Sequence, residues 1–333
     1  MGQRIAPDSN DPAAPHVPVL LAEVLAALAP LDNARIVDGT FGAGGYSRAL
    51  LEAGAHVVAI DRDPRVKPFA DALKSEFADR FTFVPGTFSS LDVLAEGQGA
   101  IDGVVLDIGV SSMQLDEADR GFSFMREGPL DMRMAAEGTS AADLVNELDE
   151  EDLANLLYAF GEERKSRRIA HRIVAARAEA PITTTLQLAQ LIEKAIGRKP
   201  GDAHPATRSF QALRIAVNSE FDQLVEGLFA AERLLGDGGR LAVVSFHSLE
   251  DRIVKRFFEP EKGAATQSRH LPQVVADEPR WRRTSKAIKA GPAELARNPR
   301  ARSATLRSGL RTTAPARPVS LAGLAVPEIG GRR

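Results

Sequence analysis

Apolar positions in the first 115 residues follow two alternating patterns. Helical spacing occurs over 19–28, just before Pro30, and again between the first three of four short β-rich runs. Those runs predict strands, and they lie at 35–37, 56–60, 81–84 and 103–106. Strands that alternate with helices predict a parallel, doubly wound sheet.

This alternation stops at about Gln114. The stretch 141–196 has helical spacing, and strand character returns only at 240–246, after a predicted helix over 218–235 and the turn GDGG. A sheet that begins early and resumes late implies an insertion. We therefore predict an α/β fold, in which a doubly wound, Rossmann-like sheet carries an all-helical domain inserted between its fourth and fifth strands.

Composition excludes several classes of protein. The chain has 333 residues, 44% of them hydrophobic, which suffices for one large or two ordinary domains. It has no cysteine, which excludes disulfides, thiolate-ligated metal centres and a cysteine nucleophile, and we expect no metal site. No apolar run approaches the roughly 18 residues of a membrane span. We expect a soluble, cytoplasmic protein with no membrane partner.

Charge is unevenly distributed, although the net charge is only −3. The segment 261–333 has 15 Lys and Arg against 5 Asp and Glu, a net charge of +10, and the first 260 residues therefore carry −13. A second basic block, 162–214, has 11 Lys and Arg against 5 Asp and Glu. Two basic regions on an acidic body suggest a polyanionic partner, but solvated helix faces and a disordered tail explain the counts equally well.

The stretch VDGTFGAGGYSRALLEAGAHVVAIDRD (37–63) predicts a strand, a glycine-rich turn, a helix and a second strand. This is the outline of a site for an adenosine-containing cofactor, although a purely structural turn also fits. Gly42 and Gly44 match a dinucleotide fingerprint, but Ser47 stands where the third glycine belongs. Asp38, directly before the turn, would repel a pyrophosphate and suits the cationic end of S-adenosylmethionine. We therefore predict S-adenosylmethionine as the cofactor.

Two further acidic residues end predicted strands. Asp61 closes the second strand and Asp107 the fourth, and ligands of open α/β sheets bind beyond the carboxyl ends of the strands. We expect Asp38, Asp61 and Asp107 to face one crevice, with Asp61 accepting hydrogen bonds from ribose hydroxyls. Each of the three is alternatively a helix N-cap without a chemical role.

Eight motifs make the sequence resemble a known family. They are DGTFGAGGYS, AIDRDP, LDIGVSS, RGFSFMREGPLDMRM, YAFGEER, HPATRSFQALRIAVNSE, SFHSLEDRIVKRFF and NPRARSATLR. In this order they resemble the MraW family of small-subunit ribosomal RNA methyltransferases, from about His16 to Arg311. The resemblance implies methyl transfer from S-adenosylmethionine to the exocyclic amine, at ring position four, of a specific cytidine in the decoding region of small-subunit ribosomal RNA.

The resemblance also implies site residues. Cofactor contacts fall on Gly44, Gly45, Tyr46, Asp61, Phe88, Asp107 and Gln114, in addition to Asp38. Tyr46 replaces the family's usual histidine, and Met113 its usual proline. We expect Tyr46 to contact the amino-acid end of the cofactor through its backbone and hydroxyl group. Phe88 is expected to pack against the adenine ring, although without the resemblance it reads as an ordinary core residue.

Residue types limit the chemistry further. Without cysteine the chain cannot activate a pyrimidine carbon by thiolate addition, so transfer to nitrogen or oxygen remains. A cytosine amine needs acceptors that hold its hydrogens, and in-line positioning supplies most of the catalysis. Asp107 is the predicted acceptor, His247 is expected to position the base rather than act as a general base, and Asn218 is a further candidate for contacting the base. Ser248 and Asp251 are expected to reach the same crevice. A splayed base also needs an aromatic face, for which the candidates are Phe122, Phe124, Phe246, His247 and Trp281.

Phosphate contacts are predicted at Arg208, Arg214, Arg300 and Arg302, with surface salt bridging as the alternative. We assign 1–16 to a disordered N-terminus, 17–115 and 216–313 to the methyltransferase domain, 116–215 to a helical insertion that recognises RNA, and 314–333 to a flexible tail. The expected partner is small-subunit ribosomal RNA within the assembled subunit.

Three other functions fit parts of the sequence. A methyltransferase of a protein or a small molecule would leave the basic regions unexplained, whereas a methyltransferase of another RNA stays open. An NAD-dependent dehydrogenase conflicts with Asp38 and Ser47. A non-catalytic ribosome assembly factor that only binds the cofactor stays open, because binding and turnover use the same residues.

Overall fold

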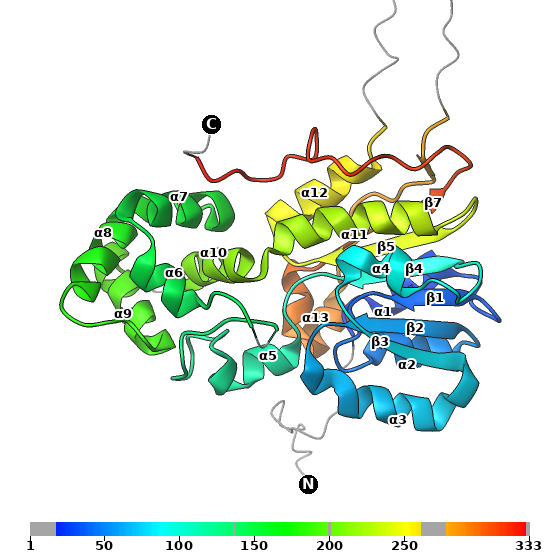
Figure 1. Ribbon diagram of the computed structural model, residues 1–333, viewed down its shortest axis with the longest axis horizontal. Helices are drawn as coiled ribbons and strands as arrows, with labels where there is room; N and C mark the ends of the chain where they lie inside the picture. Colours follow the sequence, from blue (N-terminus) through cyan, green and yellow to red (C-terminus); the bar gives the residue numbers. More distant parts are fainter. Residues whose placement is uncertain (1–17, 136, 199–200, 261–277, 331–333) are drawn as a thin grey trace, which may run out of the picture.

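The computed structural model describes residues 18–135, 137–198, 201–260 and 278–330 (Figure 1). These ranges contain a seven-stranded sheet with the strand order β3-β2-β1-β4-β5-β7-β6. Its strands are β1 (Arg35–Asp38), β2 (His56–Asp61), β3 (Phe81–Pro85), β4 (Gly103–Asp107), β5 (Arg240–Ser245), β6 (Trp281–Arg282) and β7 (Thr305–Arg311). Strands β1 to β5 pair in parallel. The predicted doubly wound α/β sheet is confirmed, with β1 to β5 ending within one residue of their predicted positions.

Successive side chains of a strand point to opposite faces of the sheet. Because the strands carry apolar side chains on both faces, helices cover both. One buried apolar cluster joins the sheet to α4 (Leu91–Leu94), α11 (Glu220–Leu234) and α12 (Ser248–Phe258). A second joins the opposite face to α1 (Leu21–Leu28), α2 (Gly45–Glu52), α3 (Lys67–Phe77) and α13 (Pro292–Arg297). In the described ranges, no helix combines the length and the apolar character that a membrane crossing requires.

Several helices lie between β4 and β5 along the chain and gather at one end of the sheet (Figure 1). They are α5 (Ser112–Asp116), α6 (Ala141–Glu147), α7 (Glu150–Gly161), α8 (Ser166–Arg177), α9 (Thr185–Ile196) and α10 (Thr207–Asn218). Helices α6 to α10 share their own buried apolar cluster, so they pack mainly on one another. Capping boxes begin α6 at Ser140 and α9 at Thr184. The assignment of 116–215 as a separate RNA-recognition domain stays a prediction.

The C-terminal region differs from its predicted structure. The sequence analysis expected no strand there, yet β7 pairs antiparallel with both β5 and β6. Residues 314–330 are held against the body of the protein, where Leu324 is buried among the residues of α11 and α12. The flexible tail stays a prediction, although Arg317 and Leu324 contact the body of the protein. The predicted disordered N-terminus, 1–16, and the last residues, 331–333, lie outside the described ranges.

A buried carboxylate anchors this C-terminal segment. Glu232 of α11 is 1% exposed and accepts hydrogen bonds from the backbone N–H and the guanidinium of Arg317, at 2.6–3.1 Å. It also accepts the indole N–H of Trp281 at 2.9 Å. Burial alone would raise the pKa of Glu232, but Arg317 and Trp281 hold it below its usual value. The ionised side chain thus joins α11, β6 and the C-terminal segment.

We expect Glu232→Ala to lower the free energy of unfolding by about 3–5 kcal/mol, because it removes the buried carboxylate that pairs with Arg317 and accepts the indole N–H of Trp281. The matched control is Glu259→Ala, whose carboxylate forms a half-exposed ion pair with Arg256 at 2.7 Å and should contribute less than about 1 kcal/mol. Denaturant-induced unfolding of both variants measures the difference. Equal losses would contradict the role assigned to Glu232.

Candidate active site

Four functional candidates stand at one edge of the sheet. Asp38, Asp61 and Asp107 are the last residues of β1, β2 and β4, which are neighbouring parallel strands. His247 follows β5, the next strand in the sheet. All four lie at the carboxyl edge, where open α/β sheets bind their ligands.

Asp38 is completely buried behind the glycine-rich turn. Its Oδ1 accepts the backbone N–H of Thr40 at 3.2 Å, and its Oδ2 accepts the hydroxyl of Ser47 at 2.7 Å. Burial raises the pKa of Asp38 to about 6, although both hydrogen bonds lower it. Ser47 occupies the position of the third fingerprint glycine because its hydroxyl group is needed to hold this carboxylate.

Asp61 fixes the shape of the glycine-rich turn. Its Oδ2 accepts the backbone N–H of Gly42 at 2.8 Å, and its Oδ1 accepts that of Asp63 at 2.9 Å. Gly42 and Gly44 have φ values of 54° and 79°, in the left-handed region that favours glycine. A Cβ on Gly44 would also lie 2.8 Å from the ring of Phe41. The turn therefore leaves no room for a side chain at Gly44, and α2 begins directly after it.

Asp107 has an unused acceptor atom, as does Glu250 beside it. Its backbone N–H donates to the hydroxyl of Thr40 at 2.7 Å, which fixes the end of β4 against the turn. Its Oδ1 is buried and has no hydrogen-bond partner in the described part of the chain. Burial raises the pKa of Asp107 well above its usual value, and the neighbouring carboxyls of Asp38 and Glu250 raise it further. A buried polar atom without a partner is rare in native proteins, so it marks a position for a ligand.

Three predicted cofactor contacts have other partners. The hydroxyl of Tyr46 donates to the carbonyl of Val19, so the expected hydroxyl contact with a cofactor is wrong and only the backbone is available. Gln114 is buried, and its amide nitrogen donates to Asp63 at 3.1 Å. The ring of Phe88 packs against Gly227 of α11, where a Cβ would lie 2.4 Å from its Cδ2. Gln114 and Phe88 thus shape the walls of the crevice.

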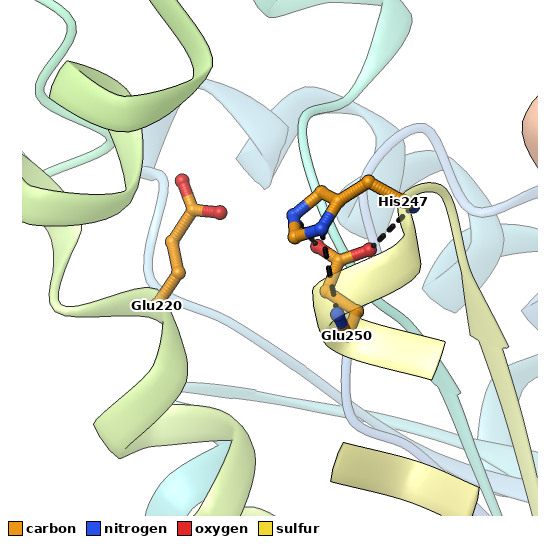
Figure 2. Close-up of side chains that lie close together, drawn as sticks. All are labelled: Glu220, His247 and Glu250. Atoms are coloured by element: carbon orange, nitrogen blue, oxygen red, sulfur yellow. Dashed lines mark hydrogen bonds and ion pairs between the residues drawn. The ribbon is translucent and has the colours of Figure 1, made fainter. Parts of the chain in front are cut away.

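A charged cluster closes the crevice on the side of the helices. Figure 2 shows Glu220, from the start of α11, and His247 and Glu250, from the start of α12, turned toward one another. Glu250 Oε2 accepts the backbone N–H groups of Phe246 and His247 at 2.8 and 3.2 Å. Glu250 Oε1 lies 3.0 Å from His247 Nε2, but the two atoms are not aligned for a hydrogen bond. The capping box of α12, with His247 as N-cap, produces this arrangement.

Arg214 of α10 supplies the positive charge of this cluster. Its Nε and Nη2 donate to the two carboxylate oxygens of Glu220 at 2.8 Å, and its Nη2 lies 3.9 Å from Glu250. Burial alone would raise the pKa of Glu250, but His247 and Arg214 lower it below its usual value. The phosphate contact at Arg214 stays a prediction, although Nε and Nη2 of its guanidinium already bind the carboxylate of Glu220.

The same cluster offers possible ligand atoms for a cation. One atom each of Glu220, His247 and Glu250 lies within 4.8 Å of the others. The guanidinium of Arg214 already sits on Glu220, so a metal ion would have to enter beside a fixed positive charge. This geometry favours an ion-pair network over a metal centre.

Other predicted contacts in this region also have structural partners. The amide of Asn218 donates to the carbonyls of Met132 and Arg214 at 2.8 and 2.9 Å and accepts the N–H of Met134 at 2.8 Å. The prediction that Asn218 contacts the base is not supported, because its amide fixes the segment before α6. Asp251 was expected to reach the crevice, but it pairs with Arg307 of β7 at 2.7 Å.

The remaining predicted arginines lie at the surface. Arg208 is exposed and donates to the carbonyl of Glu162 at 3.3 Å. Arg300 pairs with Asp116 at 2.7 Å while staying 41% exposed, and Arg302 is exposed. All three side chains are placed where phosphates could reach them.

Of the aromatic candidates for base stacking, Trp281 is buried and bonded to Glu232, which excludes it. Phe122 is also buried, and Phe124 stacks on His204 with ring centroids 4.6 Å apart. Phe246 and His247, directly after β5, remain as half-buried rings at the edge of the crevice.

Thr40, Glu220 and Glu250 are site residues that the sequence analysis did not identify. Glu250 stands three positions after His247, the spacing of a capping box, so a search for helix starts would have found it. Glu220 has no comparable local signal, because its partner Arg214 is set by the packing of α10 and α11.

Comparison with known proteins agrees with this geometry. The model of the MraW methylase family matches residues 13–311. The chain is 57% identical to a ribosomal RNA small subunit methyltransferase H from Azorhizobium caulinodans, with 100% of this chain and 98% of that protein covered. It is 59% identical to a protein of the same name from Cereibacter sphaeroides, with 96% and 97% covered. The chain therefore belongs to the MraW methylase family and is an S-adenosylmethionine-dependent methyltransferase.

Proposed function

We propose that this enzyme methylates the exocyclic amine, at ring position four, of a specific cytidine in the decoding region of small-subunit ribosomal RNA. The relatives named above are ribosomal RNA small subunit methyltransferases, which supports the substrate class. The observation that carries the proposal is the buried, unpartnered Oδ1 of Asp107 beside the glycine-rich turn. The proposed setting is the assembled small subunit in the cytoplasm.

The residues of the edge fit the cofactor. The tight turn at Gly42 and Gly44 leaves room for a backbone contact, and Asp61 keeps lone pairs for ribose hydroxyls after accepting two backbone N–H groups. Asp38 and Asp107 give this end of the crevice a negative potential that suits a sulfonium and an ammonium group. When bound, S-adenosylmethionine supplies an activated methyl group.

Asp107 then controls the nucleophile. Its free Oδ1 accepts a hydrogen bond from the cytosine amine, which turns the nitrogen lone pair toward the methyl group. Thr40 keeps the backbone of Asp107 in place through the 2.7 Å hydrogen bond to its N–H. Positioning of this kind converts binding energy into rate, because the methyl donor needs no further activation.

His247 acts as a positioning residue rather than as a base. Its Nδ1 faces the backbone N–H of Glu250 at 3.4 Å, so in the neutral ring Nδ1 accepts and the proton lies on Nε2. Nε2 is buried and lies 3.0 Å from Glu250 Oε1, so the ring positions the base through its face rather than through this proton. The product amine loses its proton to water, so the reaction needs no side chain as general base.

The proposed RNA interface lies on the rim of the crevice. Arg208 stands on the helical side, and Arg300 and Arg302 stand on the side of α13, where all three are exposed. Phosphate contacts at these positions would orient the strand without reading its sequence.

Labelled S-adenosylmethionine and small ribosomal subunits from cells that lack this methyltransferase test the proposed substrate. We expect label in one cytidine of the decoding region, located by nuclease mapping. Label in a protein or in another nucleotide would show that the proposed substrate is wrong. A lack of any transfer despite cofactor binding would favour a non-catalytic assembly factor.

Cofactor affinity should depend on pH. In the free protein burial raises the pKa of Asp38 to about 6 and the pKa of Asp107 above its usual value, and a cation bound beside them lowers both pKa values. Affinity for S-adenosylmethionine should therefore fall as pH is lowered through about 6, by up to about tenfold per pH unit for each proton released.

Calorimetry in buffers with different ionisation enthalpies counts the released protons directly. Asp107→Asn should reduce the release, and S-adenosylhomocysteine, which lacks the sulfonium charge, should show a shallower pH dependence than S-adenosylmethionine. Binding without proton release would show that the two carboxyls are already ionised in the free protein.

Substitution of Asp107 separates geometry from charge in the chemical step. We expect Asp107→Ala to abolish turnover, a loss on the order of 100-fold or more. Asp107→Asn keeps the shape and one acceptor, and should retain a small fraction of the rate with a modest cofactor defect. Single-turnover methylation at saturating cofactor measures the step itself. A wild-type rate in Asp107→Ala would leave Asp107 as a binding residue only.

A further inference from the structure

A second pocket lies in the helical part of the chain. It has a volume of about 690 Å³ and forms where the end of α7 meets the start of α8. Figure 1 shows these helices at the end of the molecule opposite α3, with the C-terminal segment running toward α7. The residues of the proposed methyl-transfer site do not line it.

The pocket is strongly basic on one side. Arg164, Lys165, Arg167 and Arg168 line it and are exposed. None of the four forms an ion pair with another residue of the described ranges, although Lys165 donates to the carbonyl of Ile196 at 3.1 Å. Four unpaired cations within five residues repel one another, and a phosphate chain would relieve that repulsion.

The other side of the pocket presents an aromatic ring. Tyr158 of α7 is 62% exposed, whereas its neighbours Leu156 and Leu157 are buried in the helical core. An exposed aromatic ring next to arginines suits single-stranded nucleic acid, because bases stack on the ring while phosphates pair with the cations. An acidic peptide would use the cations but not the ring.

The pocket is connected to the active-site edge through Glu162. This residue follows α7 directly, and its carboxylate contacts Arg252 at 3.2 Å and Ser248 at 3.1 Å, both on α12. Helix α12 begins right after His247. These contacts join the end of α7, beside the pocket, to the start of α12, beside the crevice.

The C-terminal segment forms the third wall. Asn155 of α7 donates to the carbonyl of Gly330 at 2.7 Å, and Glu328 brings a carboxylate to the lining of the pocket. Glu328 thus places a negative charge where a phosphate would lie, and it weakens the attraction of the arginines for RNA.

We propose that the pocket between α7 and α8 is an anchoring site for single-stranded RNA, with a base stacked on Tyr158 and phosphates on Arg164, Arg167 and Arg168. This proposal depends on the proposed function in one respect: the bound RNA is taken to be the ribosomal RNA that the enzyme methylates. It binds the strand away from the methylated base and therefore acts on substrate affinity rather than on the chemical step.

Fluorescence anisotropy with a labelled short oligouridine and the full-length protein tests the stacking. Tyr158→Ala should weaken binding about fivefold or more, whereas Tyr158→Phe, which keeps the ring, should bind like the wild type. Equal weakening in both variants, or none in Tyr158→Ala, would overturn the stacking contact.

Charge is tested with a matched pair of double variants. Arg164→Ala/Arg168→Ala should weaken oligouridine binding. The slope of log K against log salt concentration should become shallower by about 0.7 for each phosphate that is no longer neutralised. The control, Lys67→Ala/Lys74→Ala on α3, should change neither the affinity nor the slope. Glu328→Gln should strengthen binding, the opposite sign. Equal effects of the two double variants would show that RNA binding depends on the net charge of the protein and not on this pocket. Displacement of oligouridine by polyglutamate as readily as by unlabelled oligouridine would point to an acidic peptide instead.

Methylation of small ribosomal subunits separates this proposal from the proposed function. The pocket variants should raise KM several-fold and leave kcat unchanged, with cofactor affinity and thermal unfolding as folding controls. If no subunit is methylated even by the wild type, the proposed function fails while the oligouridine measurements still decide the anchoring site. Normal oligouridine binding in all variants would overturn the anchoring site alone.

Discussion

A carboxylate that leaves water needs a compensating charge or hydrogen bonds, and this enzyme buries several at one edge of its sheet. Asp38 is satisfied by Ser47 and Thr40, whereas Glu250 accepts two backbone N–H groups at Oε2 and has the charge of Arg214 3.9 Å from Oε1. Asp107 has neither, and its Oδ1 stays without a partner in the described structure. The edge is thus electrostatically incomplete, and in the proposed function a cationic cofactor completes it.

The compensation of Glu250 comes from outside the sheet. Arg214 belongs to α10, Glu220 to α11 and Glu250 to α12, so the ion-pair network exists only when the helices between β4 and β5 are docked on the sheet. Asn218, at the end of α10, fixes the segment around Met132 and Met134 in the same way. Buried ion pairs contribute less to stability than to the choice of one arrangement. Docking of these helices and formation of the active site are therefore one event.

The sequence was sufficient for what depends on local pattern. Strand positions follow from short apolar runs, and the convergence of Asp38, Asp61 and Asp107 follows because parallel strands end at one edge. The roles of Arg214, Asn218 and Gln114 were not predictable, since their partners depend on how separate elements pack. Gln114, for example, donates a hydrogen bond to Asp63, although both β3 and β4 lie between these two residues in the sequence. Strand β7 was missed because its polar residues hide the apolar alternation, and Arg311 is buried despite its charge.

The same chain must attract both a cation and a polyanion, and its charge distribution resolves this conflict. The negative charges of the crevice are deeply buried, and the Arg214 network neutralises part of them within a few ångströms. The unpaired arginines near α8 are exposed, as is Arg302 beside β7. Exposed charges act over roughly a Debye length of 8 Å at physiological salt. In the proposed function RNA therefore meets the basic rim first, and only an uncharged base, flipped away from its phosphates, has to enter the acidic crevice. This division lets the acidic edge select the cofactor without rejecting the substrate.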